Sequence, residues 1–272
     1  MAFDSYLTPN SFDAPEMPEV LTFHDRTKSK PISSMDAFLR SGQYVDSARG
    51  AQEASRNYKV APEVDVQELT EPLPERLATC LSARRSCREF DPEAPFDRTR
   101  LMAALRCLVP QRNAQSVIDE EVFFHWRPYP SPGGLYPVEI HLLEREGDDF
   151  ALRHVDPAGA KLRVLRARVP MGEAANALCI GDKTLAQTTK GAILFSAVWE
   201  RTVVKYGFAG YRFALMELGI VSHHVGLALA DQGVDTLHWG GFFDDRGTAL
   251  LGADPRTETL GHVLWYGAAS DA

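Results

Sequence analysis

The sequence predicts an α+β domain made of layered helices and strands. Helical and strand-like segments alternate without the regular strand–helix–strand rhythm of a doubly wound parallel sheet. One near-continuous apolar run is typical of a strand covered on both faces, and one long helical stretch is apolar almost all round. With 272 residues, the chain is long enough for one large domain with an arm.

Three segments carry the helical pattern. Apolar residues recur at helical spacing over 73–81, and a second helix begins after Asp97 as its N-cap, with Leu101 and Leu108 on its apolar face. Residues 211–233 form the longest helical stretch, which we place at the centre of the domain because it is apolar on most sides.

Five segments have the composition of strands. They are rich in β-branched, aromatic and aliphatic residues, and a turn-forming "DPAG" follows the third of them. The segments are 122–126, 138–144, 150–156, 191–199 and 262–268. Residues 1–70, rich in Pro, Ser, Asp and Gly, predict an extended or partly helical arm, so the folded domain is placed at 71–272.

Composition excludes several classes of function. A net charge of −8 disfavours non-specific nucleic-acid binding, which depends on neutralising phosphates. The N-terminus lacks the basic start and apolar run of a signal peptide, and no uninterrupted apolar stretch reaches membrane-spanning length. We therefore expect a cytoplasmic protein with no membrane contact. The glycine-rich motifs of dinucleotide and triphosphate sites, and the signatures of zinc proteases and serine hydrolases, are missing.

Cysteines and histidines predict no metal site. The four cysteines form no C-x-x-C pair, and the adjacent His223 and His224 would point about 100° apart on a helix. We expect the two histidines to serve helix packing or an interface. Cys87 lies among arginines, which predicts a lowered pKa for its thiol.

The segment "RRSCREF" is the first candidate binding site. Guanidinium groups and a hydroxyl gathered just past a helix suit a phosphomonoester, because arginine pairs with phosphate oxygens. The residues are Arg84, Arg85, Ser86 and Arg88. A solvated helix end is the alternative for this segment.

Two loops with adjacent glycines are the second candidate. The first contains Pro130, Ser131, Pro132, Gly133, Gly134 and Leu135, and the second contains Gly240 and Gly241 beside Trp239 and Phe242. Glycine leaves peptide groups bare for a flat ligand, and aromatic side chains pack on rings. Two such loops with one phosphate clamp favour flavin mononucleotide (FMN), since a glycine N–H is suited to tune a flavin ring. Taken alone, the first loop is equally an ordinary entry into a strand.

Lys205 and Tyr206 are the candidate catalytic residues. They follow a buried strand in a segment broken by Gly207 and Gly210, which predicts a catalytic loop. A lysine of lowered pKa can take a proton and a tyrosine can relay one. An exposed lysine beside a packing tyrosine is the alternative.

These segments together resemble the nitroreductase superfamily and, within it, the SagB-type azoline dehydrogenases of streptolysin- and microcin-type peptide synthetases. "RRSCREF" is similar to the superfamily's flavin-phosphate motif, and "PSPGGLYPVEI" resembles the Gly-Gly-Leu-Tyr-Pro loop of that branch. "KYGFAGYRFALMELG" resembles its Lys-Tyr element with the long helix, and "WGGFFDD" its late Gly-Gly-Phe segment. "FHDRTK" and "RNYKVAP" are similar to parts of its N-terminal region.

The resemblance implies a nitroreductase-like fold, with a central mixed or antiparallel sheet between helices. It further implies an FMN homodimer with two interface sites, in which Arg84, Ser86, Arg88 and Arg212 hold the phosphate and the two glycine loops frame the flavin ring. The implied reaction oxidises peptide thiazolines or oxazolines to azoles, with molecular oxygen as final acceptor and Lys205 and Tyr206 handling the proton. A cyclodehydratase and a leader-peptide-binding protein are the implied partners, and ribosomal and carrier-bound substrates both stay open.

Two other functions compete. A nitro- or quinone-reductase of the same fold would use NAD(P)H and would need no internal base. A non-catalytic FMN-binding scaffold would only hold a cyclodehydratase together.

Overall fold

The computed structural model describes residues 14–30, 69–115 and 123–270, and its centre is a six-stranded antiparallel sheet. The strands lie in the order β5 (Lys161–Pro170), β4 (Asp149–Asp156), β3 (Val138–Glu146), β6 (Gly191–Val198), β8 (Glu258–Gly267) and β7 (Asp235–Trp239). Every residue of β6 is buried, as expected for a central strand covered on both faces. A separate antiparallel pair joins β1 (Arg112–Gln115) to β2 (Phe123–Trp126).

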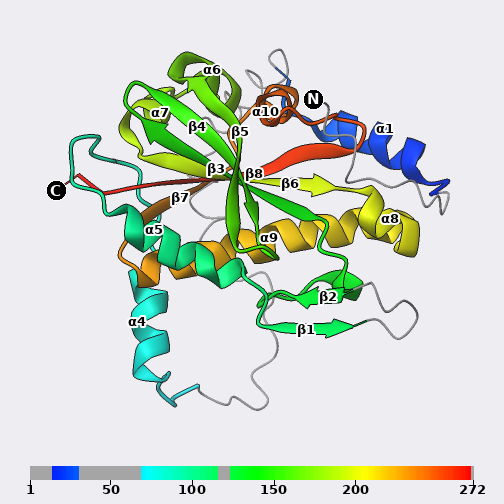
Figure 1. The fold of residues 1–272 in the computed structure, drawn as a ribbon, viewed down its shortest axis with the longest axis horizontal. Helices are drawn as coiled ribbons and strands as arrows, with labels where there is room; N and C mark the ends of the chain where they lie inside the picture. Colours follow the sequence, from blue (N-terminus) through cyan, green and yellow to red (C-terminus); the bar gives the residue numbers. More distant parts are fainter. Residues whose placement is uncertain (1–13, 31–68, 116–122, 271–272) are drawn as a thin grey trace, which may run out of the picture.

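Helices cover both faces of the sheet, so the predicted α+β class is confirmed (Figure 1). On one face lie α5 (Arg98–Leu105), the short 3-10 helix η1 (Arg106–Leu108) and α9 (Phe208–Asp231). On the other lie α6 (Met171–Leu178), α7 (Thr184–Thr188) and α10 (Asp244–Leu251). Each layer packs on its own hydrophobic core, and α4 (Glu75–Ala83) and α8 (Glu200–Tyr206) lie against α9.

Helix α9 is central, as predicted, and only one of its faces is buried. Its buried residues recur every three or four positions and face the sheet, whereas Leu215 and Met216 are exposed. By length and hydropathy alone α9 could cross a membrane, a property the sequence reading overlooked because polar residues interrupt the apolar run. The packing of one face on the sheet is that of a core helix.

The described part of the N-terminal arm is the helix α1 (Met17–Thr27), and it docks on the domain. Val20 and His24 are buried, and the His24 Nδ1 lies 3.2 Å from the Tyr211 hydroxyl of α9. Lys28 pairs with Asp245 of α10 at 2.8 Å. The rest of the predicted arm and the motif "RNYKVAP" lie outside the described residues.

Most predicted elements are present. The Asp97 side chain accepts from the Thr99 N–H at 2.9 Å and caps α5, as the sequence indicates. The structure adds elements that the sequence reading did not assign, mainly β5, α6, α7, β7 and α10. β5 lies at the edge of the sheet and is largely exposed, so it has no strong apolar alternation.

Candidate functional site

Lys205 and Tyr206 lie in the last turn of the short helix α8, not in the loop that the sequence predicts. The turn ends at Gly207, which has a φ of 54°, a value that glycine adopts without steric strain. Helix α8 then folds back on α9 at Gly210, where an added Cβ would lie 2.5 Å from the Thr202 backbone. The two helices therefore pack backbone to backbone, and this packing fixes the direction in which the side chains of Lys205 and Tyr206 point.

The ends of Lys205 and Tyr206 meet the first glycine loop. Residues Pro132–Gly134 form the short 3-10 helix η2, and Gly133 has a φ of 63°. A Cβ added at Gly133 would lie 2.5 Å from the Tyr206 hydroxyl oxygen and 2.7 Å from the Lys205 Nζ. The Lys205 Nζ also lies 5.3 Å from the centre of the Tyr206 ring. One exposed amine, one hydroxyl and one bare backbone segment thus share a small surface.

Contacts of Ser131 and Tyr136 hold the 130–135 loop in place. The Ser131 hydroxyl accepts from the Tyr136 N–H at 2.8 Å, and Tyr136 itself has a φ of 46°, which is uncommon for a side chain of this size. Arg127 lies over the Tyr136 ring at 4.6 Å, and Arg201 donates to the Tyr136 carbonyl at 2.8 Å. Such backbone strain is maintained only where the surroundings fix it, and it concentrates at functional sites.

Glu217 lies beneath this loop, and the sequence reading did not select it. Its side chain is fully buried on the sheet-facing side of α9. Burial raises the pKa of this carboxyl to about 7, while the Ser131 hydroxyl and Arg127 act to lower it. The only sequence signal is one acidic residue inside the apolar run "ALMELGIV".

The predicted phosphate clamp, which consists of Arg84, Arg85, Ser86 and Arg88, lies beside β7. Ser86 forms a bridge with Thr236, and the Cys87 N–H donates to the Thr236 carbonyl at 2.9 Å. Arg85 and Arg88 are exposed, and neither makes an ion pair within the part of the chain that the structure describes. Their guanidinium groups are therefore open to an anionic ligand.

The Cys87 prediction is wrong. Burial raises the pKa of its thiol, and the nearby carboxylates Asp235 and Glu89 add to the effect. The Sγ lies 3.2 Å from the Glu89 carbonyl. The neighbouring arginines do not offset these influences, because their side chains extend into solvent.

Gly240 and Gly241 follow β7 on the same edge of the sheet as the clamp. Gly240 is exposed, with open space around it, whereas the Gly241 carbonyl accepts from Ile180 N–H and Trp239 Nε1. Phe242 is 5 % exposed and belongs to the core, so the prediction that it packs on a ligand ring is wrong.

The candidate residues therefore form two groups, one toward each end of α9. The group that contains Lys205, Tyr206 and the 130–135 loop lies at its N-terminal end, together with the exposed Arg212. The clamp follows α4, whose Cys80 contacts the Leu227 carbonyl near the other end. From Arg212 to Leu227 the helix rises about 22 Å. Within one chain, Arg212 and the arginines of the clamp are not brought together.

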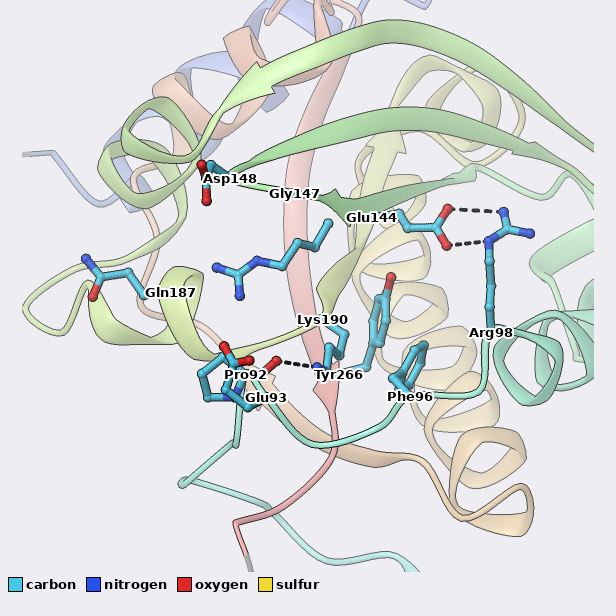
Figure 2. A pocket seen from close by; sticks show the side chains of 11 residues that line it. Pro92, Glu93, Phe96, Arg98, Glu144, Gly147, Asp148, Gln187, Lys190 and Tyr266 are labelled. Carbon is cyan, nitrogen blue, oxygen red and sulfur yellow. Dashed lines mark hydrogen bonds and ion pairs between the residues drawn. The ribbon is translucent and has the colours of Figure 1, made fainter.

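A hollow of about 630 Å³ is lined by residues that belong to neither glycine loop, and Figure 2 shows its lining side chains. It lies where β3 ends, at the opposite end of that strand from the 130–135 loop, between Glu144, Lys190 and Tyr266. Arg98 pairs with Glu144 inside it, and the Lys190 ammonium donates to the Pro92 carbonyl, as the dashed lines show. Acidic and basic side chains are mixed in this lining, so the hollow does not select one sign of charge.

The two adjacent histidines diverge as expected. His223 is exposed, and the His224 Nε2 lies 3.0 Å from the Cys107 carbonyl in a packing contact. Among the described residues, no group of three or more His, Cys, Asp or Glu side chains is arranged to hold a metal ion.

Fold and site together give an α+β domain in which an exposed lysine and a half-buried tyrosine meet a glycine loop. A family model described as "Nitroreductase family" matches residues 81–265, so the chain belongs to the nitroreductase family. This confirms the superfamily resemblance.

Two curated proteins are similar in sequence. "Microcin B17-processing protein McbC" of Escherichia coli is 28 % identical over 151 residues, which are 53 % of this chain and 55 % of that protein. The matched part thus spans about half the length of that relative. "Putative nitroreductase MJ1384" of Methanocaldococcus jannaschii is 27 % identical over 190 residues, 69 % of this chain and 86 % of that protein.

One solved structure resembles nearly the whole chain. It is titled "E. coli Microcin synthetase McbBCD complex with truncated pro-MccB17 bound". The TM-score is 0.69 at 20 % identity, with 97 % of this chain and 100 % of that chain covered. This similarity shows that the two chains share one fold over nearly the whole of this chain.

Proposed function

We propose that this protein is an FMN-dependent azoline dehydrogenase, which oxidises thiazolines or oxazolines in a peptide to the aromatic azoles. The observation that carries the proposal is the meeting of Lys205 and Tyr206 with the Gly133 loop. The similarity to the microcin B17-processing protein favours the same substrate class.

The lysine and tyrosine suit the proton half of this reaction. Aromatisation of an azoline removes a proton from one ring carbon and a hydride from its neighbour. Lys205 is exposed and would accept the proton at Nζ, while the Tyr206 hydroxyl would orient that amine or relay the proton. The backbone at Gly133 would leave room for the flat ring between these groups and the loop.

The residues present fit FMN, which nitroreductase-family proteins bind. Arg85 and Arg88 have no carboxylate partner among the described residues and would hold the phosphate together with Arg84 and Ser86. The open backbone at Gly240, and the loop with Pro130, Ser131, Gly133, Gly134 and Leu135, would frame the ring. When bound, FMN supplies the two-electron acceptor for the hydride, with molecular oxygen as the final oxidant.

A homodimer would unite the two groups of residues. One chain places the clamp and the Lys205 group toward opposite ends of α9, so a second copy is needed to bring Lys205, Tyr206 and Arg212 to the same cofactor. Exposed apolar side chains on α4 and α9 support such an interface, because a monomer rarely leaves them uncovered together. They are Leu77 and Leu81 on α4 and Leu215 and Met216 on α9, and the exposed Leu73 lies just before α4.

The substrate peptide would reach the enzyme through partner proteins. The similar solved chain comes from a multi-subunit synthetase with a bound precursor peptide. We therefore propose a cyclodehydratase, which makes the azoline, and a leader-peptide-binding protein as partners. We also propose a cytoplasmic location.

The first test is the absorbance spectrum of the purified protein, with mass spectrometry of any cofactor released by heat. Stoichiometric FMN supports the clamp and the glycine loops. A colourless protein that also fails to bind added FMN contradicts the cofactor proposal.

The second test separates dehydrogenase from reductase. A synthetic peptide with one thiazoline should lose two mass units in air and gain the absorbance of a thiazole, while NADH is oxidised slowly. The similarity to MJ1384 makes an NAD(P)H-dependent nitro- or quinone-reductase the second candidate, and fast NADH oxidation without azoline turnover would establish it.

The third test addresses a purely structural role. If a reconstituted synthetase still makes azoles after Lys205 and Tyr206 are both replaced, the chain acts as a non-catalytic FMN-binding scaffold.

A further inference from the structure

The hollow of about 630 Å³ where β3 ends has no role in the proposed function. Its volume lies within the range of clefts that hold small ligands, which is about 300–1,000 Å³. The 130–135 loop lies beyond the other end of this strand, and β3 rises about 24 Å from Val138 to Arg145. A ligand in this hollow would therefore bind apart from the 130–135 loop and the Lys205 group.

The charged side chains of the lining differ in whether they have an ionic partner. As a whole the lining carries both signs of charge, but Glu144 is already neutralised by Arg98 at 2.5 Å and by Arg153 at 2.9 Å. Arg145 and Lys190, in contrast, form no ion pair within the part of the chain that the structure describes. Two positive charges of the hollow are thus left without a carboxylate.

The guanidinium group of Arg145 is poorly satisfied. One of its terminal nitrogens lies 3.5 Å from the Ala186 carbonyl oxygen and 3.7 Å from the Met171 sulfur, and both distances are long for a hydrogen bond. Its Nε is buried and has no hydrogen-bond partner among the described residues. Because removing a charged donor from water without good acceptors is costly, this side chain has unused capacity to bind an anion.

Arg145 and Lys190 lie opposite each other on neighbouring chain segments. The Arg145 N–H donates to the Lys190 carbonyl at 3.0 Å, which continues the antiparallel register of β3 and β6 beyond the pair Glu144–Gly191. Both side chains line the same hollow, and the Lys190 ammonium donates to the neutral Pro92 carbonyl. Like charges on directly opposite residues destabilise a sheet. An anion that both cations reach would remove this repulsion.

The hollow also has an aromatic wall. Phe96 is half-buried, and its ring centre lies 5.7 Å from that of the buried Tyr266, with 33° between the ring planes, so the two rings lie side by side (Figure 2). Such a wall suits a flat apolar group. The acidic residues Glu93 and Asp148 are exposed and screened by water, and they disfavour a doubly charged phosphate more than a singly charged carboxylate.

We propose that this hollow binds a carboxylate attached to a flat aromatic body, with Arg145 and Lys190 holding the carboxylate and Phe96 packing on the ring. Arginine binds a carboxylate through paired hydrogen bonds, and the lysine ammonium adds a further donor. A free aromatic acid and the C-terminal end of a peptide that finishes in an aromatic residue both present this chemistry. The site is independent of the proposed FMN site and of the reaction assigned to it.

The test is a titration of the full chain followed by fluorine NMR. The probes are para-fluorobenzoate, an N-acetylated tripeptide that ends in para-fluorophenylalanine, and the neutral amide of each. We expect saturable binding of at least one acid with a Kd of about 1 mM or below, and none of its amide. Tighter binding of the benzoate assigns the site to free acids, and tighter binding of the tripeptide assigns it to a peptide end. Lack of saturable binding up to about 10 mM, or equal binding of acid and amide, overturns the proposal.

Substitutions locate the binding. Arg145→Met combined with Lys190→Met should weaken binding of the acid by at least about tenfold, because both charge-assisted contacts are lost. Arg145→Lys keeps the charge without the paired donors, so it should weaken binding less, and it replaces the double variant if that variant fails to fold. The matched control is Arg168→Met, since Arg168 is exposed, pairs with Asp149 at 2.5 Å and does not line the hollow. This control should bind the acid as the wild type does.

Binding of the acid at the clamp would be recognised in the same titration. An affinity that persists in the Arg145→Met/Lys190→Met variant and is lost in Arg85→Ala/Arg88→Ala places the acid in the clamp and overturns the proposal. FMN content gives a separate measurement and should be unchanged in the Arg145 and Lys190 variants. A protein that carries no FMN but binds the acid through Arg145 contradicts the proposed function and supports this site.

Discussion

The two ends of α9 present opposite kinds of surface. At the N-terminal end, Lys205 and Tyr206 are fixed by a backbone contact at Gly210 and meet a strained loop. At the other end, the arginines of the clamp extend into solvent beside β7 without carboxylate partners in the described structure. The first region is organised by contacts within the chain, whereas the exposed arginines of the second have no ion pair within the described structure.

In the proposed function, the difference between the two ends of α9 corresponds to the difference between catalysis and cofactor binding. Groups that transfer protons must be held in place before the substrate arrives, because small displacements reduce the rate strongly. Groups that bind a phosphate can remain mobile, because the ligand orders them through paired hydrogen bonds. Substitutions at the two ends should therefore affect different measurements.

The largest effect is expected at the N-terminal end. Lys205→Ala should lower azoline turnover by about 10²- to 10⁴-fold, the usual contribution of a general base. FMN content and thermal stability should stay unchanged, since Lys205 is exposed and forms no ion pair among the described residues. Lys161→Ala, on the exposed edge strand β5, is the matched control and should be fully active. Normal turnover of Lys205→Ala would remove this residue from the mechanism.

Substitutions in the clamp should weaken the affinity for FMN and leave the chemical step unchanged. Replacing Arg85 and Arg88 together by alanine should weaken FMN binding by about 10²-fold, since each charge-assisted contact contributes roughly 1.5 kcal/mol or more. The measurement is fluorescence titration of the cofactor-free protein. Arg256→Ala, which removes an exposed arginine paired with Asp254, is the control. An unchanged Kd for the double variant would show that the phosphate binds elsewhere.

The buried carboxyl behind the loop should make stability depend on pH. Glu217 has a folded pKa of about 7 against an ordinary 4.5, so the unfolded chain ionises first as the pH rises. Stability is unaffected below pH 4.5, falls between 4.5 and 7, and then levels off, with a total loss of about 3 kcal/mol. Urea unfolding of wild type and Glu217→Gln should therefore diverge in favour of the variant between pH 5 and 8. If the free energies of unfolding of wild type and Glu217→Gln changed with pH in parallel, the raised pKa of Glu217 would be contradicted.

The smallest effect distinguishes close contact from backbone strain. Gly133 and Gly147 have φ values of 63° and 64°, but an added Cβ meets Lys205 and Tyr206 only at Gly133, while Gly147 has nothing within 4 Å. Replacement of either by alanine should cost about 1 kcal/mol of stability. Only Gly133→Ala should also reduce turnover, by roughly tenfold, as the displaced amine loses its alignment. Equal activity of both variants would mean that the Gly133 contact is irrelevant to catalysis.

Sequence patterns predicted the elements whose residues are uniformly apolar or clearly capped. β6 and α5 are of this kind, because eight consecutive buried positions and an Asp97 cap leave strong local signals. Helix α8 was predicted as a loop, since seven residues without a side-chain cap have no periodicity to recognise and depend on packing against α9.

The candidate site was predicted by residue type and not by arrangement. The motifs selected the lysine, the tyrosine, the arginines and the glycines, but their division between the two ends of α9 depends on tertiary topology. The exclusion of Phe242 from the site has the same origin, because the sequence cannot show that this residue, which lies just before α10, packs into the core. Glu217 escaped notice because one carboxyl in an apolar helix is also the pattern of a solvated surface position.

The position of β8 also determines when this protein can fold during synthesis. β8 is made last, yet it lies between β6 and β7 and is the strand that joins them. Until residue 267 has left the ribosome, the fully buried strand β6 has an open edge, and β7, the strand that precedes Gly240, has no sheet to join. The nascent chain must therefore remain protected from aggregation until β8 is made, and the glycine loop after β7 cannot take its final position before that strand is inserted.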